Sequence, residues 1–283
     1  MLRKRRSSPS VGLSFDHVSL SKRGPTLALD VPSGASVAIM GTAASGKSHL
    51  LSCILGESSP EQGSIARPDE VLSIDSPEWT RRDTPSSIVR AKVGKSATQI
   101  GNDALTALNL SDFRQKPCYL LTPGQQSAAA LLPAFLSKAE LICIDRLLDE
   151  LDPVVLEAVW FQLQQMRAKG SVMVFTTYRP DLGERADFVL VMKNGQVAFS
   201  GTPDSLRRTQ AEYELQVRTE NRPGVRALVE PFEIEIQDTP EGLRISAKEG
   251  QAIAAKLLQD GYGDVQFVIL RQPTFAEALA RVI

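Results

Sequence analysis

Cysteine is scarce in this sequence, and long apolar runs are absent. The three cysteines, Cys53, Cys118 and Cys143, lie in apolar surroundings at spacings that fit no metal site, so we expect buried, reduced thiols in the cytosol. The most apolar window, 128–136, is far shorter than the roughly 20 residues of a membrane-spanning helix and contains Pro133. A net charge of −1 gives no reason to expect nucleic acid as a partner. The composition therefore disfavours a disulfide scaffold, a membrane-spanning subunit and a nucleic-acid-binding protein.

Residues 1–10 likewise lack the apolar segment of a secretory signal. Because they carry an Arg-Lys-Arg-Arg run among serines, we expect residues 1–11 to form a disordered basic tail, with contact to anionic lipid head groups as the alternative. The remaining composition, 42% hydrophobic and 23% charged, is ordinary for a soluble globular protein. A chain of 283 residues is long enough for one large domain and a small one.

What the sequence does contain is a phosphate-binding motif, G-x-x-x-x-G-K-[ST]. Its residues are Gly41, Thr42, Ala43, Ala44, Ser45, Gly46, Lys47 and Ser48. We expect them to bind nucleotide together with His49, which starts the helical pattern that follows. The apolar run 37–40 precedes the motif, which gives the strand, loop and helix that it requires. Glycines at both ends let backbone N–H groups converge on phosphate oxygens, while Lys47 would reach the β- and γ-phosphates and Ser48 would bind Mg²⁺. The alternative is a glycine-rich turn without a ligand.

A carboxylate at the end of a second strand is the next candidate. The buried run 141–145 ends at Asp145, and the similar run 172–176 follows a helical stretch. Buried strands that alternate with helices predict an α/β fold with a largely parallel sheet, closed by an antiparallel hairpin at 188–199. This arrangement would place Asp145 at the same sheet edge as the phosphate loop, where it is suited to hold Mg²⁺ through water.

Two further parts are expected. The region 56–116 is rich in serine, proline and charge and predicts a small, loosely packed subdomain; we expect a helical subdomain over about 57–135. From about residue 211 the pattern reads strand, helix, strand, strand, helix, strand and a terminal helix, which is the split βαβ, ferredoxin-like order. It holds no chemical motif, so we interpret it as a regulatory or interaction module. We therefore expect a nucleotide-binding domain over 12–208 and a small α+β domain over 209–283.

The ordered set of motifs resembles the ATP-binding subunits of ABC transporters, over about residues 12–205. An L-T-P-G-Q stretch stands where the family signature reads L-S-G-G-Q, and Leu151 and Asp152 occupy the dimer-contact loop. The signature residues are Leu121, Thr122, Pro123, Gly124 and Gln125. The final domain and the stretch 273–279 resemble the tail of type-2 exporter subunits. The resemblance implies a P-loop ABC-type fold that binds ATP and Mg²⁺, and a dimer in which each signature caps the partner's nucleotide.

Three departures from the family pattern concern hydrolysis. Arg146 follows Asp145 where the family has its catalytic glutamate, and a guanidinium cannot accept a proton. The switch histidine falls at Thr177, or at Tyr178 if the loop is shorter, and the glutamine that links Mg²⁺ to the membrane partner falls near Ser76. Loss of a general base typically removes about 10²–10⁴ in rate. The sequence therefore predicts a site that binds Mg-ATP and hydrolyses it weakly or only with a catalytic paralogue.

Two of the unusual residues have alternative interpretations. Pro123 supplies no N–H, which leaves the signature a partly competent cap; the alternative is that Thr122 and Pro123 simply begin a helix well. Arg146 either adds a fixed cation beside the triphosphate or pairs with Asp149 or Glu150 on the surface.

We expect a degenerate ABC subunit that forms a homodimer, or a heterodimer with a catalytic paralogue. It would couple to a permease or envelope complex at the cytoplasmic, inner face of the cell membrane, with no nucleic acid as partner. The alternative is a non-transport scaffold in an envelope-associated machine, in which ATP is structural or absent. A chromosome-type ABC ATPase is disfavoured because the segment between Ser48 and Leu121 leaves no room for long coiled coils, and a GTPase because no N-K-x-D motif is present.

Overall fold

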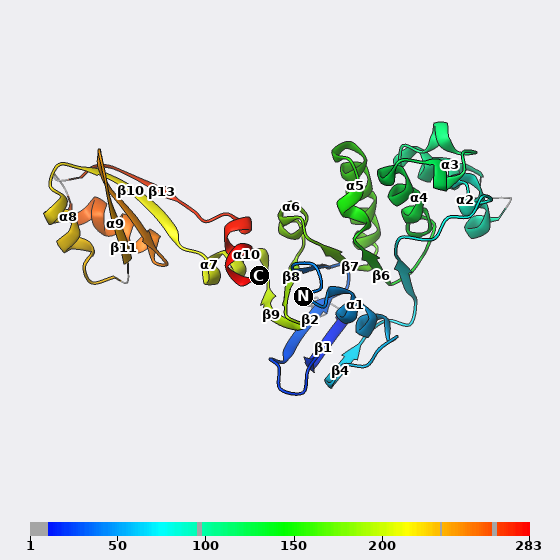
Figure 1. Cartoon of the computed structure of the whole chain (residues 1–283), viewed down its shortest axis with the longest axis horizontal. Helices are drawn as coiled ribbons and strands as arrows, with labels where there is room; N and C mark the ends of the chain where they lie inside the picture. The colour runs from blue at the N-terminus through cyan, green and yellow to red at the C-terminus, as the bar shows by residue number, and fades with distance from the viewer. Residues whose placement is uncertain (1–10, 95–97, 233, 262–264) are drawn as a thin grey trace, which may run out of the picture. The chain divides into compact units, whose positions relative to one another are not determined.

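A computed structural model describes residues 11–94, 98–232, 234–261 and 265–283. It divides into two compact units, Met1–Gly201 and Thr202–Ile283, which are described separately below (Figure 1). The tail expected over residues 1–11 lies, except for Val11, outside the described residues.

The first unit is built on two sheets, as its alternating pattern predicts. The main sheet has the strand order β5-β6-β7-β3-β8-β9, in which all neighbours are parallel except the antiparallel pair β8 and β9. A second, antiparallel sheet has the order β2-β1-β4. The strands are β1 (Val11–Ser19), β2 (Leu27–Pro32), β3 (Ser36–Met40), β4 (Gln62–Ala66), β5 (Val71–Ile74), β6 (Leu141–Asp145), β7 (Val172–Thr177), β8 (Phe188–Lys193) and β9 (Gln196–Gly201). The predicted fold, a largely parallel sheet with an antiparallel β subdomain, is confirmed.

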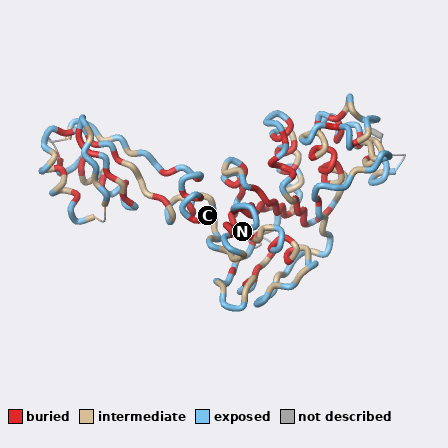
Figure 2. Tube along the Cα trace, in the orientation of Figure 1, coloured by how far each residue is buried: buried red, intermediate tan, exposed pale blue. Residues whose placement is uncertain are grey.

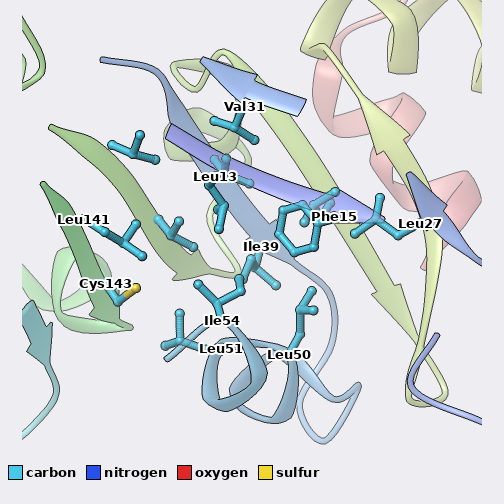
Figure 3. Packing of buried hydrophobic residues seen from close by; sticks show 14 of the residues in the cluster. Leu13, Phe15, Leu27, Val31, Ile39, Leu50, Leu51, Ile54, Leu141 and Cys143 are labelled. Carbon is cyan, nitrogen blue, oxygen red and sulfur yellow. The ribbon is translucent and has the colours of Figure 1, made fainter. Parts of the chain in front are cut away.

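The core of this unit lies between the two sheets and the first helix (Figure 3). All residues of β3 and β7 are buried, as expected for strands covered on both faces (Figure 2). Leu13 and Phe15 of β1, Ile39 of β3, and Leu50 and Ile54 of α1 (Lys47–Leu55) belong to one buried cluster. Each such side chain contributes about 1.5–3 kcal/mol on burial, so this cluster fixes the loop between β3 and α1.

Among the described residues of the first unit there are five further helices and three short 3₁₀ turns. They are α2 (Pro85–Val93), α3 (Thr98–Ala107), α4 (Pro123–Phe135), α5 (Pro153–Ala168), α6 (Pro180–Glu184), η1 (Ser111–Phe113), η2 (Cys118–Leu120) and η3 (Leu147–Glu150). The segment 57–135, expected to be a helical subdomain, begins instead with β4, which pairs with β1, and β5, which pairs with β6. Its first helix starts at Pro85, and Leu105 of α3 and the following Leu108 and Leu110 are buried.

The second unit contains the predicted ferredoxin-like arrangement. Its elements are α7 (Pro203–Gln210), β10 (Tyr213–Thr219), α8 (Arg222–Val229), β11 (Ile234–Thr239), β12 (Gly242–Ala247), α9 (Gly250–Asp260), β13 (Val265–Arg271) and α10 (Phe275–Val282). The antiparallel sheet has the order β11-β12-β10-β13, and α8 and α9 share its buried cluster. The unit begins at Thr202 rather than at residue 209, because α7 packs against α10.

The cysteines are free and buried, as predicted. Burial raises the pKa of Cys118 and Cys143 to about 12, so these thiols stay protonated at neutral pH. Within the described ranges, none of the helices combines the length and apolar character that crossing a bilayer requires.

Candidate functional site

The phosphate-binding motif forms a cradle between β3 and α1. Its backbone has positive φ at Gly41 (145°), Ala44 (59°) and Gly46 (99°). A Cβ atom added at Gly41 would lie 2.4 Å from the Met192 carbonyl oxygen, so a glycine is needed there. Gly46 caps α1 without any side-chain hydrogen bond, which leaves N–H groups of the first turn open toward the cradle. The loop therefore has the backbone shape that an anionic ligand requires.

Lys47 lies folded over this cradle. Its Nζ atom donates hydrogen bonds to the carbonyl oxygens of Gly41 (2.9 Å) and Thr42 (2.7 Å). Partial burial lowers the pKa of Lys47, and nearby Asp145 opposes that effect. The ammonium group is thus held at the mouth of the loop, beside the carboxylate of the neighbouring strand.

Ser45 carries an orphaned polar atom inside the cradle. The residue is buried, and its Oγ atom has no hydrogen-bond partner in the part of the chain that the structure describes. A Cβ atom at Gly41 would lie 2.6 Å from this oxygen, which therefore faces the start of the loop. A buried hydroxyl without a partner costs about 1–3 kcal/mol, so a polar ligand at the loop would relieve a real cost.

The Asp145 carboxylate lies at the edge that the strand pattern predicted. Asp145 Oδ2 accepts a hydrogen bond of 3.3 Å from Ser48 Oγ, and Oδ1 accepts one from Thr176 Oγ1. A hydroxyl and a carboxylate are the oxygen ligands that Mg²⁺ uses beside phosphates and water. Among the described residues, no three His, Cys, Asp or Glu side chains gather into a metal site, so Mg²⁺ here would depend on Ser48, Asp145 and ligand oxygens. The donor set fits Mg²⁺ with a nucleotide.

Arg146 is placed directly beside this carboxylate. Its Nε atom lies 3.9 Å from Asp145 Oδ1, and its side chain is about two-thirds exposed. Its backbone is left-handed, with φ 59°, and its N–H donates to Thr176 Oγ1 at 2.9 Å. The alternative pairing with Asp149 or Glu150 is not found among the described residues. Arg146 therefore adds a cation at the position where the family pattern has a carboxylate.

Thr177, at the expected switch position, is tied into the protein interior. Its hydroxyl donates to Asp149 Oδ1 and accepts from the Arg179 N–H at 3.0 Å. The Tyr178 N–H donates to the other Asp149 oxygen at 3.3 Å, while the Tyr178 side chain is 62% exposed. Burial raises the pKa of Asp149, although both hydrogen bonds oppose that shift. Ser76 is exposed and follows β5 at the same sheet edge.

The signature stretch begins α4 with a reciprocal cap. Thr122 Oγ1 accepts from the Gln125 N–H at 3.4 Å, and Gln125 Oε1 accepts from the Thr122 N–H at 3.2 Å. Pro123 takes the first helical position, and a Cβ atom at Gly124 would lie 3.0 Å from the Glu150 carbonyl oxygen. Thr122 and Pro123 thus do begin a helix well. No hydrogen bond among the described residues joins this stretch to the phosphate loop.

The two residues of the dimer-contact loop also have local roles. Asp152 Oδ1 accepts from the N–H groups of Val154 and Val155, both at 3.0 Å, and so caps α5. Leu151 is buried beside it. His49 is exposed in the first turn of α1.

Thr176 and Asp149 were not predicted as site residues, although the sequence offered Asp149 as a possible surface partner of Arg146. Both take part in the hydrogen bonds that join β6, η3 and β7. A signal for Thr176 and Thr177 was present, because two threonines end a strand that is otherwise apolar. No signal marked Asp149, which lies in a run of charged and aliphatic residues.

A cavity of about 860 Å³ lies away from these residues. Its lining includes Glu140 and Ser171, which directly precede β6 and β7. The candidate site lies at the opposite, carboxyl ends of the same strands. The phosphate loop is therefore an open cradle on the surface rather than part of that cavity.

Comparison with known proteins gives one family. The family described as "ABC transporter" matches residues 25–148. The cytochrome c biogenesis ATP-binding export protein CcmA of Gluconobacter oxydans is 30% identical over 163 residues, 56% of this chain and 77% of its own. The cobalt import ATP-binding protein CbiO of Rhodobacter capsulatus is 29% identical over 199 residues, 62% of this chain and 71% of its own. A solved ATP-binding subunit of an ABC transporter, 22% identical, superposes with a TM-score of 0.59 over 69% of this chain and 92% of its own.

Proposed function

The chain belongs to the ATP-binding proteins of the ABC transporter family, and we propose that it holds Mg-ATP at the phosphate loop while hydrolysing it slowly or only with a catalytic partner. The observation that carries this proposal is the placement of Ser48 and Asp145 3.3 Å apart at the mouth of the loop, with Arg146 beside them. The family binds ATP with Mg²⁺ in general. In this chain the groups suited to hold nucleotide stand together, next to a residue that cannot act as a base.

Binding rests on groups with separate tasks. Open N–H groups at the start of α1 and the Lys47 ammonium would neutralise phosphate oxygens. Ser48 and Asp145 would supply two of the oxygens around Mg²⁺. The magnesium ion would bridge phosphate oxygens and offset their charge. The cation of Arg146 favours the retention of a triphosphate at the same edge.

Slow hydrolysis is supported by two features. A guanidinium remains protonated and cannot take a proton from the attacking water, which typically removes about 10²–10⁴ in rate. Thr177 at the switch position directs its hydroxyl to Asp149 rather than toward the loop.

Partners are part of the proposal. We infer that two ATP-binding protomers enclose the nucleotides, with the 121–125 signature of one facing the phosphate loop of the other, and that the pair couples to a membrane permease or envelope complex. Because Pro123 provides no N–H, a paralogue with an intact glutamate would gain only a partly competent cap.

Calorimetric titration of the full-length protein with Mg-ATP, followed by steady-state ATPase assay, tests the proposal. We expect saturable binding with turnover near the detection limit. Robust turnover that is abolished by Lys47→Ala would show that the hydrolysis part is wrong. No Mg-ATP binding would overturn the binding part and favour a scaffold in which ATP has no role.

A further inference from the structure

We propose that Thr176 is a positioning residue, whose hydroxyl orients the Asp145 carboxylate so that one of its oxygens is presented to Mg²⁺ beside Ser48. This inference rests on the proposed function, since it concerns the magnesium that accompanies ATP. It assigns a task to a side chain that belongs to none of the family motifs recognised in the sequence.

The sheet register brings the two residues together. Asp145 of β6 stands opposite Thr176 of β7 in the parallel pair, at the carboxyl ends of both strands. Thr176 is completely buried, whereas the Asp145 side chain is partly exposed. A fixed interior hydroxyl therefore meets a carboxylate that reaches out to the surface.

The direction of the hydroxyl proton follows from its partners. Thr176 Oγ1 accepts a hydrogen bond from the Arg146 N–H at 2.9 Å. Its own hydrogen is thereby free to point at Asp145 Oδ1. With Oδ1 occupied in this way, Oδ2 is the oxygen that faces Ser48 Oγ, at 3.3 Å. The two carboxylate oxygens are thus divided between a protein partner and the proposed metal position.

This division matters because an aspartate carboxylate otherwise rotates easily. The second side-chain torsion of aspartate has a broad energy profile, so a lone carboxylate samples many orientations. Partners that orient metal ligands commonly contribute about 10- to 100-fold to metal affinity. The same hydroxyl also accepts from Arg146, whose left-handed backbone starts the chain away from the strand. Thr176 therefore fixes both the ligand and the start of the segment that follows it.

Thr177 provides a matched control. It is also completely buried at the end of β7, and its hydroxyl also donates to a carboxylate, that of Asp149. Ser48 donates to Asp145 and not to Asp149. Replacing either threonine by valine removes one buried hydroxyl of the same kind, but only Thr176 contacts the proposed metal ligand.

The test is ATP titration of the full chain in excess Mg²⁺ and again in EDTA, with the ratio of the two dissociation constants as readout. Wild type should bind ATP more tightly with Mg²⁺. Thr176→Val should reduce that ratio by about tenfold while leaving the EDTA affinity unchanged. Thr176→Ser, which keeps the hydroxyl, and Thr177→Val should retain the wild-type ratio. Thr176→Ala, which cannot clash, serves in place of the valine variant if that variant unfolds below the assay temperature.

The outcomes separate this inference from the proposed function. An unchanged ratio in Thr176→Val, or an equal loss in Thr177→Val, would overturn the positioning role while leaving Mg-ATP binding intact. A wild type that binds ATP equally with and without Mg²⁺ would also overturn it, without touching ATP binding itself. A wild type that binds no ATP under either condition would remove both the proposed function and this inference.

Discussion

The hydroxyl of Thr177 donates a hydrogen bond to the carboxylate of Asp149, and this contact joins the end of β7 to the 3₁₀ turn that follows Asp145. The second Asp149 oxygen accepts from the Tyr178 N–H, so one buried carboxylate holds two consecutive residues. Burial of that carboxylate costs solvation, which raises its pKa despite both hydrogen bonds. The buried carboxylate of Asp149 thus fixes the start of the segment after β7, although its burial costs solvation free energy.

This cost predicts a pH dependence of stability. Because the folded-state pKa of Asp149 is raised above its ordinary value of 3.8, the folded protein binds this proton more tightly than the unfolded chain does. The contribution of Asp149 to the free energy of unfolding is therefore fully present below about pH 3.8, and it is lost as the pH rises through the raised pKa of the folded state. In Asp149→Asn that loss is absent. The free energy of unfolding of wild type relative to Asp149→Asn should fall with rising pH and then level off.

Urea unfolding followed by tryptophan fluorescence measures this difference, since both tryptophans, Trp79 and Trp160, lie in the first unit. Glu150→Gln is the matched control, because Glu150 is adjacent in sequence and exposed. A fall of the same size in this control would mean that the pH dependence does not come from the buried carboxylate of Asp149. A pH-independent difference for Asp149→Asn would contradict the raised pKa.

The buried cysteines predict a simple chemical result. Burial raises the pKa of Cys118 and Cys143 to about 12 and also raises that of Cys53. Thiolate is the reactive form, so an aromatic disulfide reagent at pH 8 should label no thiol in the folded protein and all three in denaturant. Rapid labelling of one thiol under native conditions would show that its surroundings open on the time scale of the assay.

Much of the fold could be predicted from the sequence, because buried strands and helices show characteristic patterns of apolar residues. The runs 141–145 and 172–176 are apolar at nearly every position, which predicts strands covered on both faces, and β6 and β7 are such strands. Alternation in the last unit likewise predicted the order of its strands and helices. The short strands β4 and β5 were missed because runs of four or five residues with exposed positions leave a weak signal.

The hydrogen-bond partners at the site could not be predicted from the sequence in the same way. The pairing of Thr176 with Asp145 depends on the register of two parallel strands that are separated by a whole helix, so no tight turn between them sets that register. Asp149 lies in the turn that follows Arg146, whose backbone is left-handed, a conformation that arginine rarely takes. Motif spacing located Ser48 and Asp145, because Ser48 is the last residue of the phosphate-binding motif and Asp145 ends a buried strand.

Lys47 is expected to carry a large share of nucleotide affinity. A charge-assisted hydrogen bond contributes about 1.5–3 kcal/mol, so Lys47→Ala should weaken Mg-ATP binding by about 10- to 100-fold. Lys169→Ala is the matched control, because this exposed lysine ends α5 near the opposite ends of the strands. Fluorescence titration with a labelled ATP analogue measures both variants. Equal affinities in Lys47→Ala and wild type would show that nucleotide binds elsewhere.

Arg146 is the residue whose replacement is expected to raise activity. Its backbone is already left-handed at φ 59°, so glutamate would meet the same backbone cost as arginine, and the N–H bond to Thr176 would be kept. The side chain is exposed beside Asp145, which leaves room for the shorter carboxylate of glutamate. A change at this position therefore alters chemistry more than structure.

Arg146→Glu should raise the steady-state ATPase rate by about tenfold. A well-placed base typically contributes about 10²–10⁴ in rate. We expect a smaller gain here because Thr177 still lacks a ring nitrogen at the switch position. Arg146→Gln separates two causes, since it removes the cation without supplying a base. If the base is what this site lacks, only the glutamate variant gains activity. Equal gains in both variants would mean that the arginine inhibits by its charge or bulk, and that hydrolysis draws its base from another residue.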